Sequence, residues 1–467
     1  MSDHCVRIAR RASAALCFGA LAFTAQAQSL PSRAGVARLA DSLATDFIAT
    51  HGAPAVSIAV VRGRDTLMFG GWGKADVENN VAATPRTVYR IGSITKQFTS
   101  AAVMQLVEQG KVKLDDSIGT YLATLPSGWR GVKVRQLLNH TSGIPSYTDI
   151  GERWVRRWGE EMTPDTLVAL TANDTAWFKP GTSWRYDNSG YVVLGMLVEK
   201  VAGHPWATDI LERFAKPLGL ADTRNCGTRE LIMRRARGYE AESGGMFANA
   251  TYLAMSQPHA AGALCSTVGD LAAWNRALAS GKVVSLSSYA LMTTPEGAAT
   301  RTKYGFGLVH DTLAGRAVIT HGGGIPGFSS ANAWFPNDAM SVTVLTNSGS
   351  ARSDALLAQV ARAALGVPLL RAPPKVAISA DDRARYLGVY AMKLGANMAD
   401  LTVSEKTGEL YAQLAGQSPN QLISYGNSVF GMGFDPALRL TFAVENGKAA
   451  RVTLLQGGQT FEGLRNP

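Results

Sequence analysis

The spacing of apolar residues changes several times along the chain, and each change predicts a different element. Apolar positions recur every three or four residues across 34–51, which predicts an amphipathic helix. The stretch 55–69 is β-rich at both ends with turn residues between, which predicts a hairpin at the start of a sheet. A second helix is expected to begin near Ser93 and to end at Gly110, since glycine commonly follows the last residue of a helix.

The pattern from 110 to about 280 is mainly helical and rich in loops, and strands return after residue 304. Four strands and one closing helix are expected, at 304–309, 317–320, 330–335, 342–346 and 353–365. The two ends of residues 28–368 therefore share one antiparallel sheet, and a helical region is inserted between them. The expected fold class is α/β (α+β), an antiparallel sheet flanked by helices.

The last part of the chain has a different pattern. A Pro-containing linker is expected at 369–380. Short strands are expected at 386–390, 401–403, 409–412, 421–423, 438–442 and 450–454. Their even spacing predicts a small antiparallel β-barrel at 381–467 as an accessory domain.

Composition narrows the class of protein. The 467 residues are 46% hydrophobic and 18% charged, which indicates a globular chain with ample material for a core. The net charge is +10, but no dense run of Lys and Arg alternates with aromatic residues, so no nucleic-acid partner is expected. The oligomeric state stays open.

Residues 1–27 have the three parts of a cleavable signal peptide. Three arginines precede an apolar stretch at 12–23, which is too short to span a bilayer, and Ala-Gln-Ala at 25–27 is a cleavage signal. The mature chain should begin at Gln28 and be periplasmic or secreted, with no stable membrane insertion. Cys226 and Cys265 would then remain in an oxidising compartment, either as a disulfide or as buried thiols. Neither has the spacing of a metal ligand, so no metal or cofactor is expected.

The candidate chemistry begins with Ser93 and Lys96. Residues three apart on a helix share a face, so the amine of Lys96 can reach the Ser93 hydroxyl. Serine is a poor nucleophile until a neighbouring base takes its proton, and Ser-x-x-Lys is one compact way to supply that base. The plainer interpretation is a helix-capping serine beside a surface lysine.

Two further segments supply what such a pair needs. Tyr186 can share the proton and Asn188 can bind a substrate amide, although each can also be an ordinary packed or turn residue. His321 is followed by three glycines, Gly322 to Gly324, which let a substrate approach the backbone closely. An amide N–H there, with that of Ser93, would form an oxyanion hole.

These segments, in this order, resemble the serine β-lactamase/penicillin-binding-protein superfamily, in particular its class C β-lactamase-like branch, which includes D-aminopeptidases and esterases. The resemblance covers roughly residues 35–365, and 381–467 resembles the lipocalin-like domain often attached to such hydrolases. It rests on motifs that include Ser93-Ile94-Thr95-Lys96, the stretch 137–144, Tyr186-Asp187-Asn188, Tyr304-Gly305-Phe306-Gly307 and His321-Gly322-Gly323.

The resemblance implies a role for each position. Ser93 would be the acylated nucleophile, Lys96 would take or relay its proton, and Tyr186 would be partner base and then acid. Asn188, His321 and Gly323 would bind substrate, and the N–H groups of Ser93 and Gly324 would hold the oxyanion. The implied function is hydrolysis of an amide or ester bond in a small molecule or short peptide (a β-lactam, a D-amino-acid peptide or an ester). The alternative is a catalytically idle protein that binds peptidoglycan.

Two other segments resemble the catalytic motifs, and two histidines affect what the site is expected to do. Lys406-Thr407-Gly408 and Tyr425-Gly426-Asn427 imitate catalytic motifs, but their flanks predict hairpin turns in the C-terminal domain. His140 could be a base, but a structural hydrogen bond is favoured. His321 stands where many β-lactamases carry Lys, and because histidine is mostly neutral at pH 7, substrates that depend on an anionic group should bind less well.

Overall fold

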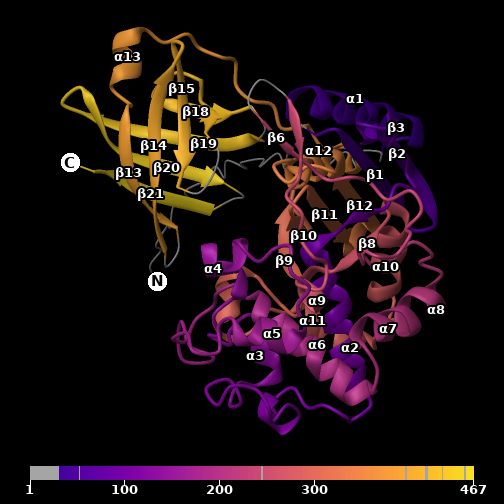
Figure 1. The fold of residues 1–467 in the computed structure, drawn as a ribbon. Helices are drawn as coiled ribbons and strands as arrows, with labels where there is room; N and C mark the ends of the chain where they lie inside the picture. The colour runs from indigo at the N-terminus through magenta and orange to yellow at the C-terminus, as the bar shows by residue number, and fades with distance from the viewer. Residues whose placement is uncertain are drawn as a thin grey trace, which may run out of the picture.

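The computed structural model describes residues 31–466 except 52, 243–245, 395–396, 416–418, 434 and 457–458. The expected signal peptide at 1–27 lies outside the described residues. Among the described residues, no helix is long and apolar enough to cross a bilayer. Figure 1 shows two parts, a larger one that combines helices and a sheet, and a yellow-orange β-structure formed by the C-terminal residues.

The larger part is built on an antiparallel sheet. In the described residues its strand order is β3-β2-β1-β12-β11-β10-β9. Its strands are β1 (Ala55–Arg62), β2 (Asp65–Asp76), β3 (Val81–Ala82), β9 (Val309–Leu313), β10 (Arg316–Ile325), β11 (Phe328–Phe335) and β12 (Met340–Thr346). Strand β1, from the start of the chain, pairs with β12, from the end of this part, as predicted.

Helices cover both faces of this sheet. On one face, α1 (Arg33–His51) and α12 (Ser353–Leu365) enclose a core that includes Val56, Val344 and Val360. On the other face, α10 (Val268–Ala279) covers β1 and β12 and joins a second core shared with the helical region. The hydrophobic effect thus holds the sheet between two apolar layers.

The inserted region is mainly helical, as predicted. Its longest helices are α2 (Thr95–Glu108) and α6 (Asn188–Ala202), which pack on each other. The shorter helices are α3 (Val134–Leu138), α4 (Glu152–Val155), α5 (Pro164–Ala169), α7 (Trp206–Ile210), α8 (Lys216–Leu218), α9 (His259–Gly262) and α11 (Leu286–Thr293). Three short strands, β4 (Tyr89–Arg90), β8 (Leu264–Ser266) and β5 (Arg224–Asn225), form a small sheet in that order, and β6 (Tyr239–Ala241) pairs with β7 (Phe247–Asn249).

One expected strand is wrong. Residues 304–309 do not form a strand; only Tyr304 and Val309 face each other across a short loop that leads into β9. The two glycines of this loop explain why. Gly307 has a φ of +70°, and a Cβ on Gly305 would lie 2.1 Å from the carbonyl oxygen of Met292. The segment is therefore folded closely against its neighbours, where an extended strand with side chains would not fit.

The C-terminal strands form a nearly closed antiparallel barrel. Their order in the described residues is β16-β15-β14-β13-β21-β20-β19-β18-β17. The strands are β13 (Gly388–Leu394), β14 (Asn397–Lys406), β15 (Glu409–Leu414), β16 (Asn420–Gln421), β17 (Ile423–Ser424), β18 (Val429–Met432), β19 (Asp435–Glu445), β20 (Lys448–Gln456) and β21 (Gln459–Arg465). Buried side chains such as Tyr390, Phe430 and Phe442 fill its core. The stretch 369–380 runs beside this barrel, where the N–H of Val376 donates to the Ser424 carbonyl. The domain boundaries at 28, 368 and 381 stay predictions.

Candidate active site

Ser93 lies in a single helical turn between the small sheet and α2. Strand β4 leads into the 3-10 turn η1 (Gly92–Ile94), and α2 follows without a break. Gly92 has a φ of +50°, and a Cβ there would come within 3.0 Å of the Gly324 carbonyl oxygen on β10. Only a glycine fits this left-handed, crowded position comfortably. The backbone around Ser93 is therefore held against the strand that carries His321.

Lys96 is fully buried one turn after Ser93. Its Nζ lies 3.2 Å from Ser93 Oγ, 2.8 Å from Asn188 Oδ1 and 2.8 Å from the carbonyl oxygen of Ala261. Burial lowers the pKa of Lys96 well below its usual value, and the charge of Asp187 opposes that shift. Low pKa favours the free amine. Two hydrogens of that amine can go to Asn188 and Ala261, which leaves its lone pair to accept the Ser93 proton.

Asn188 is fixed by contacts on both sides of its amide. It is the first residue of α6, and its Nδ2 donates to Thr148 Oγ1 at 3.0 Å while its Oδ1 faces Lys96. The backbone N–H of Asn188 donates to Ser146 Oγ. The amide orientation is thus determined by its neighbours. Ala261 and Thr148 are contacts that no short motif in the sequence pointed to.

Tyr186 packs against Lys96, but its hydroxyl has no hydrogen-bond partner among the described residues. Its ring packs over Lys96, with Nζ 4.7 Å from the ring centroid. Its hydroxyl is buried and makes no hydrogen bond to another described residue. Burial raises the pKa of Tyr186 strongly, and the nearby Ser93 hydroxyl opposes this to a smaller degree. A free, buried hydroxyl beside the nucleophile is suited to carry a proton once a substrate is present.

His140 makes the structural hydrogen bond that was favoured for it. Its Nδ1 accepts the backbone N–H of Asp187 at 3.1 Å, and its ring packs 4.3 Å from that of Tyr186. Burial and the charges of Lys96 and His321 lower its pKa well below the usual value. Asp187 in turn caps α6 by accepting the N–H of Gly190, and burial raises its pKa to about 7. His140 and Asp187 therefore support the loop that carries Tyr186 and Asn188.

His321 is buried on β10, and both of its ring nitrogens have partners. Nδ1 lies 2.6 Å from the Gly322 carbonyl oxygen and must donate to it, because a carbonyl cannot donate. Nε2 then accepts the hydroxyl of Tyr304 at 2.9 Å. Burial, with a smaller contribution from the charge of Lys96, lowers the pKa of His321 to about 4. His321 is therefore neutral near pH 7, as its residue type suggested.

The glycines after His321 let β10 approach the Ser93 turn. A Cβ on Gly323 would lie 2.0 Å from the Ile91 carbonyl oxygen, so a side chain there would push the strand away. Gly324 borders open space on its side-chain side and lies next to Gly92 on its backbone side. The structure thus brings the predicted oxyanion residues Ser93 and Gly324 to adjacent places. Their role as hydrogen-bond donors to substrate stays a prediction.

The two imitating motifs lie elsewhere. Residues 406–408 form the turn between β14 and β15, where Lys406 pairs with Glu409 and both Thr407 and Gly408 have positive φ. Tyr425-Gly426-Asn427 forms the turn between β17 and β18. Both were expected to be turns in the C-terminal domain, and both belong to the barrel.

Cys265 lies on β8 and Cys226 directly follows β5, and no disulfide joins them. Both are buried free thiols. The Cys265 thiol, which hydrogen-bonds with that of Cys226, is the main cause of a lowered Cys226 pKa. Of the two alternatives for this pair, the structure has the thiols.

Comparisons with known proteins agree with this arrangement. Residues 40–366 match the family model described as Beta-lactamase. The putative penicillin-binding protein PbpX of Bacillus subtilis (strain 168) is 29% identical over 289 residues, which are 62% of this chain and 69% of that protein. The D-aminopeptidase of Brucella ovis is 28% identical over 325 residues, 68% of this chain and 60% of that protein. The solved D-stereospecific amidohydrolase from Streptomyces sp. is 32% identical with a TM-score of 0.62, covering 70% of this chain and 97% of that one.

Proposed function

This chain belongs to the Beta-lactamase family, and from that membership we propose that it cleaves an amide or ester bond of a small substrate through an acyl-enzyme on Ser93. The chain is a serine hydrolase of the β-lactamase, D-aminopeptidase or carboxylesterase type, and its relatives include a D-aminopeptidase and a D-stereospecific amidohydrolase. The observation that carries the acyl-enzyme is the position of Lys96, whose buried Nζ lies 3.2 Å from Ser93 Oγ with two other acceptors for its hydrogens.

The reaction then follows from the geometry. Ser93 Oγ attacks the carbonyl carbon while its proton passes to Lys96 Nζ, and the carbonyl oxygen becomes an oxyanion held by the N–H groups of Ser93 and Gly324. The amine or alcohol leaves with a proton relayed from Lys96 through Tyr186. Water then attacks the ester formed on Ser93 and gives its proton to the same pair. The pair returns that proton to Ser93 Oγ as the ester bond breaks and the acid leaves.

Neutral His321 narrows the substrate. A cation at this place would attract a carboxylate near the scissile bond, whereas this imidazole, with its pKa lowered to about 4, carries no charge at pH 7. We therefore favour amides and esters, such as D-amino-acid amides or simple esters, over β-lactams that bear a carboxylate. The idle peptidoglycan-binding alternative keeps the fold but predicts no turnover.

The test is a substrate panel with a covalent probe. We expect purified wild-type protein to release chromophore from D-amino-acid p-nitroanilides or p-nitrophenyl esters faster than it opens nitrocefin, and to be labelled by a fluorophosphonate. Ser93→Ala should lose both turnover and labelling while it keeps its melting temperature. Labelling that persists in Ser93→Ala would contradict the nucleophile, and a wild type that neither labels nor turns over any substrate would favour the idle protein.

Export is part of the same proposal. It is supported by the arginines, apolar stretch and Ala-Gln-Ala sequence of residues 1–27. Protein recovered from a periplasmic or culture fraction should begin at Gln28. Recovery of the protein only in the cytoplasm, with Met1 retained, would contradict it.

A further inference from the structure

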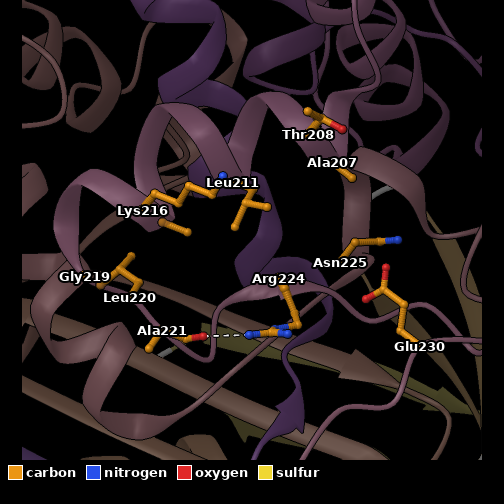
Figure 2. A pocket seen from close by; sticks show the side chains of 11 residues that line it. Ala207, Thr208, Leu211, Lys216, Gly219, Leu220, Ala221, Arg224, Asn225 and Glu230 are labelled. Carbon is orange, nitrogen blue, oxygen red and sulfur yellow. Dashed lines mark hydrogen bonds between the residues drawn. The ribbon is translucent and has the colours of Figure 1, made fainter.

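A cavity outside the Ser93 site lies between helices α7 and α8 and the edge strand β5. Its volume is about 730 Å³, within the roughly 300–1,000 Å³ that small-molecule sites occupy. None of the residues described above as members of the candidate active site lines it. Its lining residues come from one stretch of chain between Ala207 and Glu230. Figure 2 shows the helical wall on one side and Arg224, Asn225 and Glu230 on the other.

The helical wall is apolar and has an unusual backbone. Ala207, Leu211 and Ala215 line the cavity, and Leu211–Ala215 forms a π-helical turn between α7 and α8. The cause is local, because Pro217 has no N–H to donate to the carbonyl of Arg213, as an α-helix would require. Such wide turns occur frequently at functional sites. Here the turn places Leu211 and Ala215 on the wall of the cavity.

The opposite wall holds a cation that has hydrogens to spare. Arg224 donates from Nη2 to the Ala221 carbonyl oxygen at 2.8 Å, and its Nε has no partner among the described residues. Lys216, the other cation of the cavity, is already paired with Glu212 at 2.5 Å. Arg224 is therefore the group of this cavity best able to bind a carboxylate, to which its N–H groups would donate.

An anion and an amide complete this wall. Glu230 and Asn225 flank Gly227: a Cβ on that glycine would lie 3.8 Å from Asn225 Nδ2 and 4.0 Å from Glu230 Cδ. Neither side chain makes a hydrogen bond or ion pair with another described residue. The Glu230 carboxylate can accept hydrogen bonds from an ammonium group, and the Asn225 amide can accept one more through its Oδ1. With one spare cation and one spare anion, the cavity favours neither a simple anion nor a simple cation.

We propose that this cavity binds a small zwitterion with an apolar side chain, that is, a free α-amino acid or a dipeptide. Arg224 holds the carboxylate, Glu230 and Asn225 hold the ammonium group, and Leu211 with its alanine neighbours contacts the side chain. Strand β5 is at the edge of its small sheet, so its outer backbone groups can bond to a dipeptide amide. The proposal does not depend on the acyl-enzyme, since no residue of this cavity takes part in it.

Calorimetric titration of the full-length chain tests the proposal. The Ser93→Ala protein is titrated with leucine (both enantiomers) and with leucyl-leucine. The tighter binder shows whether the ligand is a free amino acid or a dipeptide. Leucinamide lacks the carboxylate and N-acetylleucine lacks the ammonium group, and each should bind at least tenfold more weakly than leucine. Equal binding of either blocked compound, or no binding of any zwitterion, would overturn the proposal.

Variants locate the binding. Arg224→Gln and Glu230→Gln should each weaken binding at least tenfold, whereas Arg451→Gln and Glu462→Gln, which make the same charge changes on exposed barrel positions, should not. Binding should also survive when Ser93 of the wild type is blocked by a fluorophosphonate. Binding that is lost on blocking but unchanged in Arg224→Gln would place the zwitterion at Ser93 and overturn the proposal. If a cavity variant fails to fold, the comparison of leucine with leucinamide and N-acetylleucine still tests whether the protein recognises a zwitterion.

Discussion

Two regions of this molecule carry short sequences that resemble the same catalytic motifs. The hydrolase part has Tyr186-Asp187-Asn188 and His321-Gly322-Gly323, and the barrel has Tyr425-Gly426-Asn427 and Lys406-Thr407-Gly408. In the first region Ser93 of η1 and Asn188 of α6 contact the buried amine of Lys96 on α2, and His321 of β10 lies beside Tyr186. In the second region the two motifs stand on separate hairpin turns, and residues 406–408 are exposed.

The difference between the two regions is one of surroundings. Lys96 is surrounded by protein and its pKa is lowered by burial, which makes an amine into a base. Lys406 faces water at the tip of a turn. A motif thus acquires chemistry only where long-range packing removes water and supplies partners, and this can be tested by making the same change in each region.

The largest expected effect comes from the two lysines. Lys96→Ala should lower kcat/KM by about 10²–10⁴-fold, the usual contribution of a positioned base, while Lys406→Ala leaves it unchanged. The measurement is steady-state turnover of the best substrate from the panel, with melting temperatures to confirm that both variants fold. Comparable losses in the two variants would remove the distinction between the regions.

The site residues that lie in short motifs could be predicted from the sequence, whereas the contacts made by long-range packing could not. Ser93, Lys96 and Asn188 could be brought together from sequence because short motifs place them at helix starts, and α12 was predicted with its bounds because its apolar face is regular. The Ala261 carbonyl could not be predicted, since any residue type offers one. The hydrogen bond between the Tyr304 hydroxyl and His321 was also not predicted, because the sequence pattern indicated a strand where Tyr304 lies in a loop.

In the barrel, the sequence predicted the architecture but not every strand. Its alternating pattern predicted the architecture, but β18 (Val429–Met432) and β21 (Gln459–Arg465) were missed. Strand β21 is the partner of β13 and β20, so it helps to close the barrel. Its sequence carries Glu462 and Gly463 in the middle, which weaken the β signal, and pairing on both sides stabilises the strand nonetheless.

A smaller effect is expected from the two tyrosines. Tyr186→Phe keeps the ring that packs on Lys96 and His140 and removes only the unpartnered hydroxyl, so kcat should fall by about 10²-fold with little change in melting temperature. Tyr425→Phe, which removes the corresponding hydroxyl in the barrel, should leave kcat unchanged. An unchanged kcat in Tyr186→Phe would exclude this hydroxyl from the proton relay.

Two histidines on neighbouring strands separate the effect of burial from that of residue type, and this difference is measured on stability. His321 on β10 is buried, and burial lowers its pKa from 6.5 to about 4, whereas His310 on the paired strand β9 is exposed. Between these pH values the unfolded chain binds a proton at His321 that the folded chain does not, so the free energy of unfolding rises with pH in this window. Relative to His321→Gln, the wild type should therefore lose up to about 3 kcal/mol of stability as the pH falls from 6.5 to 4.

Denaturant unfolding at several pH values measures this difference. The wild-type-minus-variant curve should be flat above pH 6.5 and fall below it, and the contribution of buried His140 cancels because both proteins contain it. His310→Gln, at the exposed position on the paired strand β9, is the matched control. If the two histidine variants gave parallel curves, burial would not control the charge of His321, and the argument that a neutral imidazole favours substrates without a carboxylate would lose its physical basis.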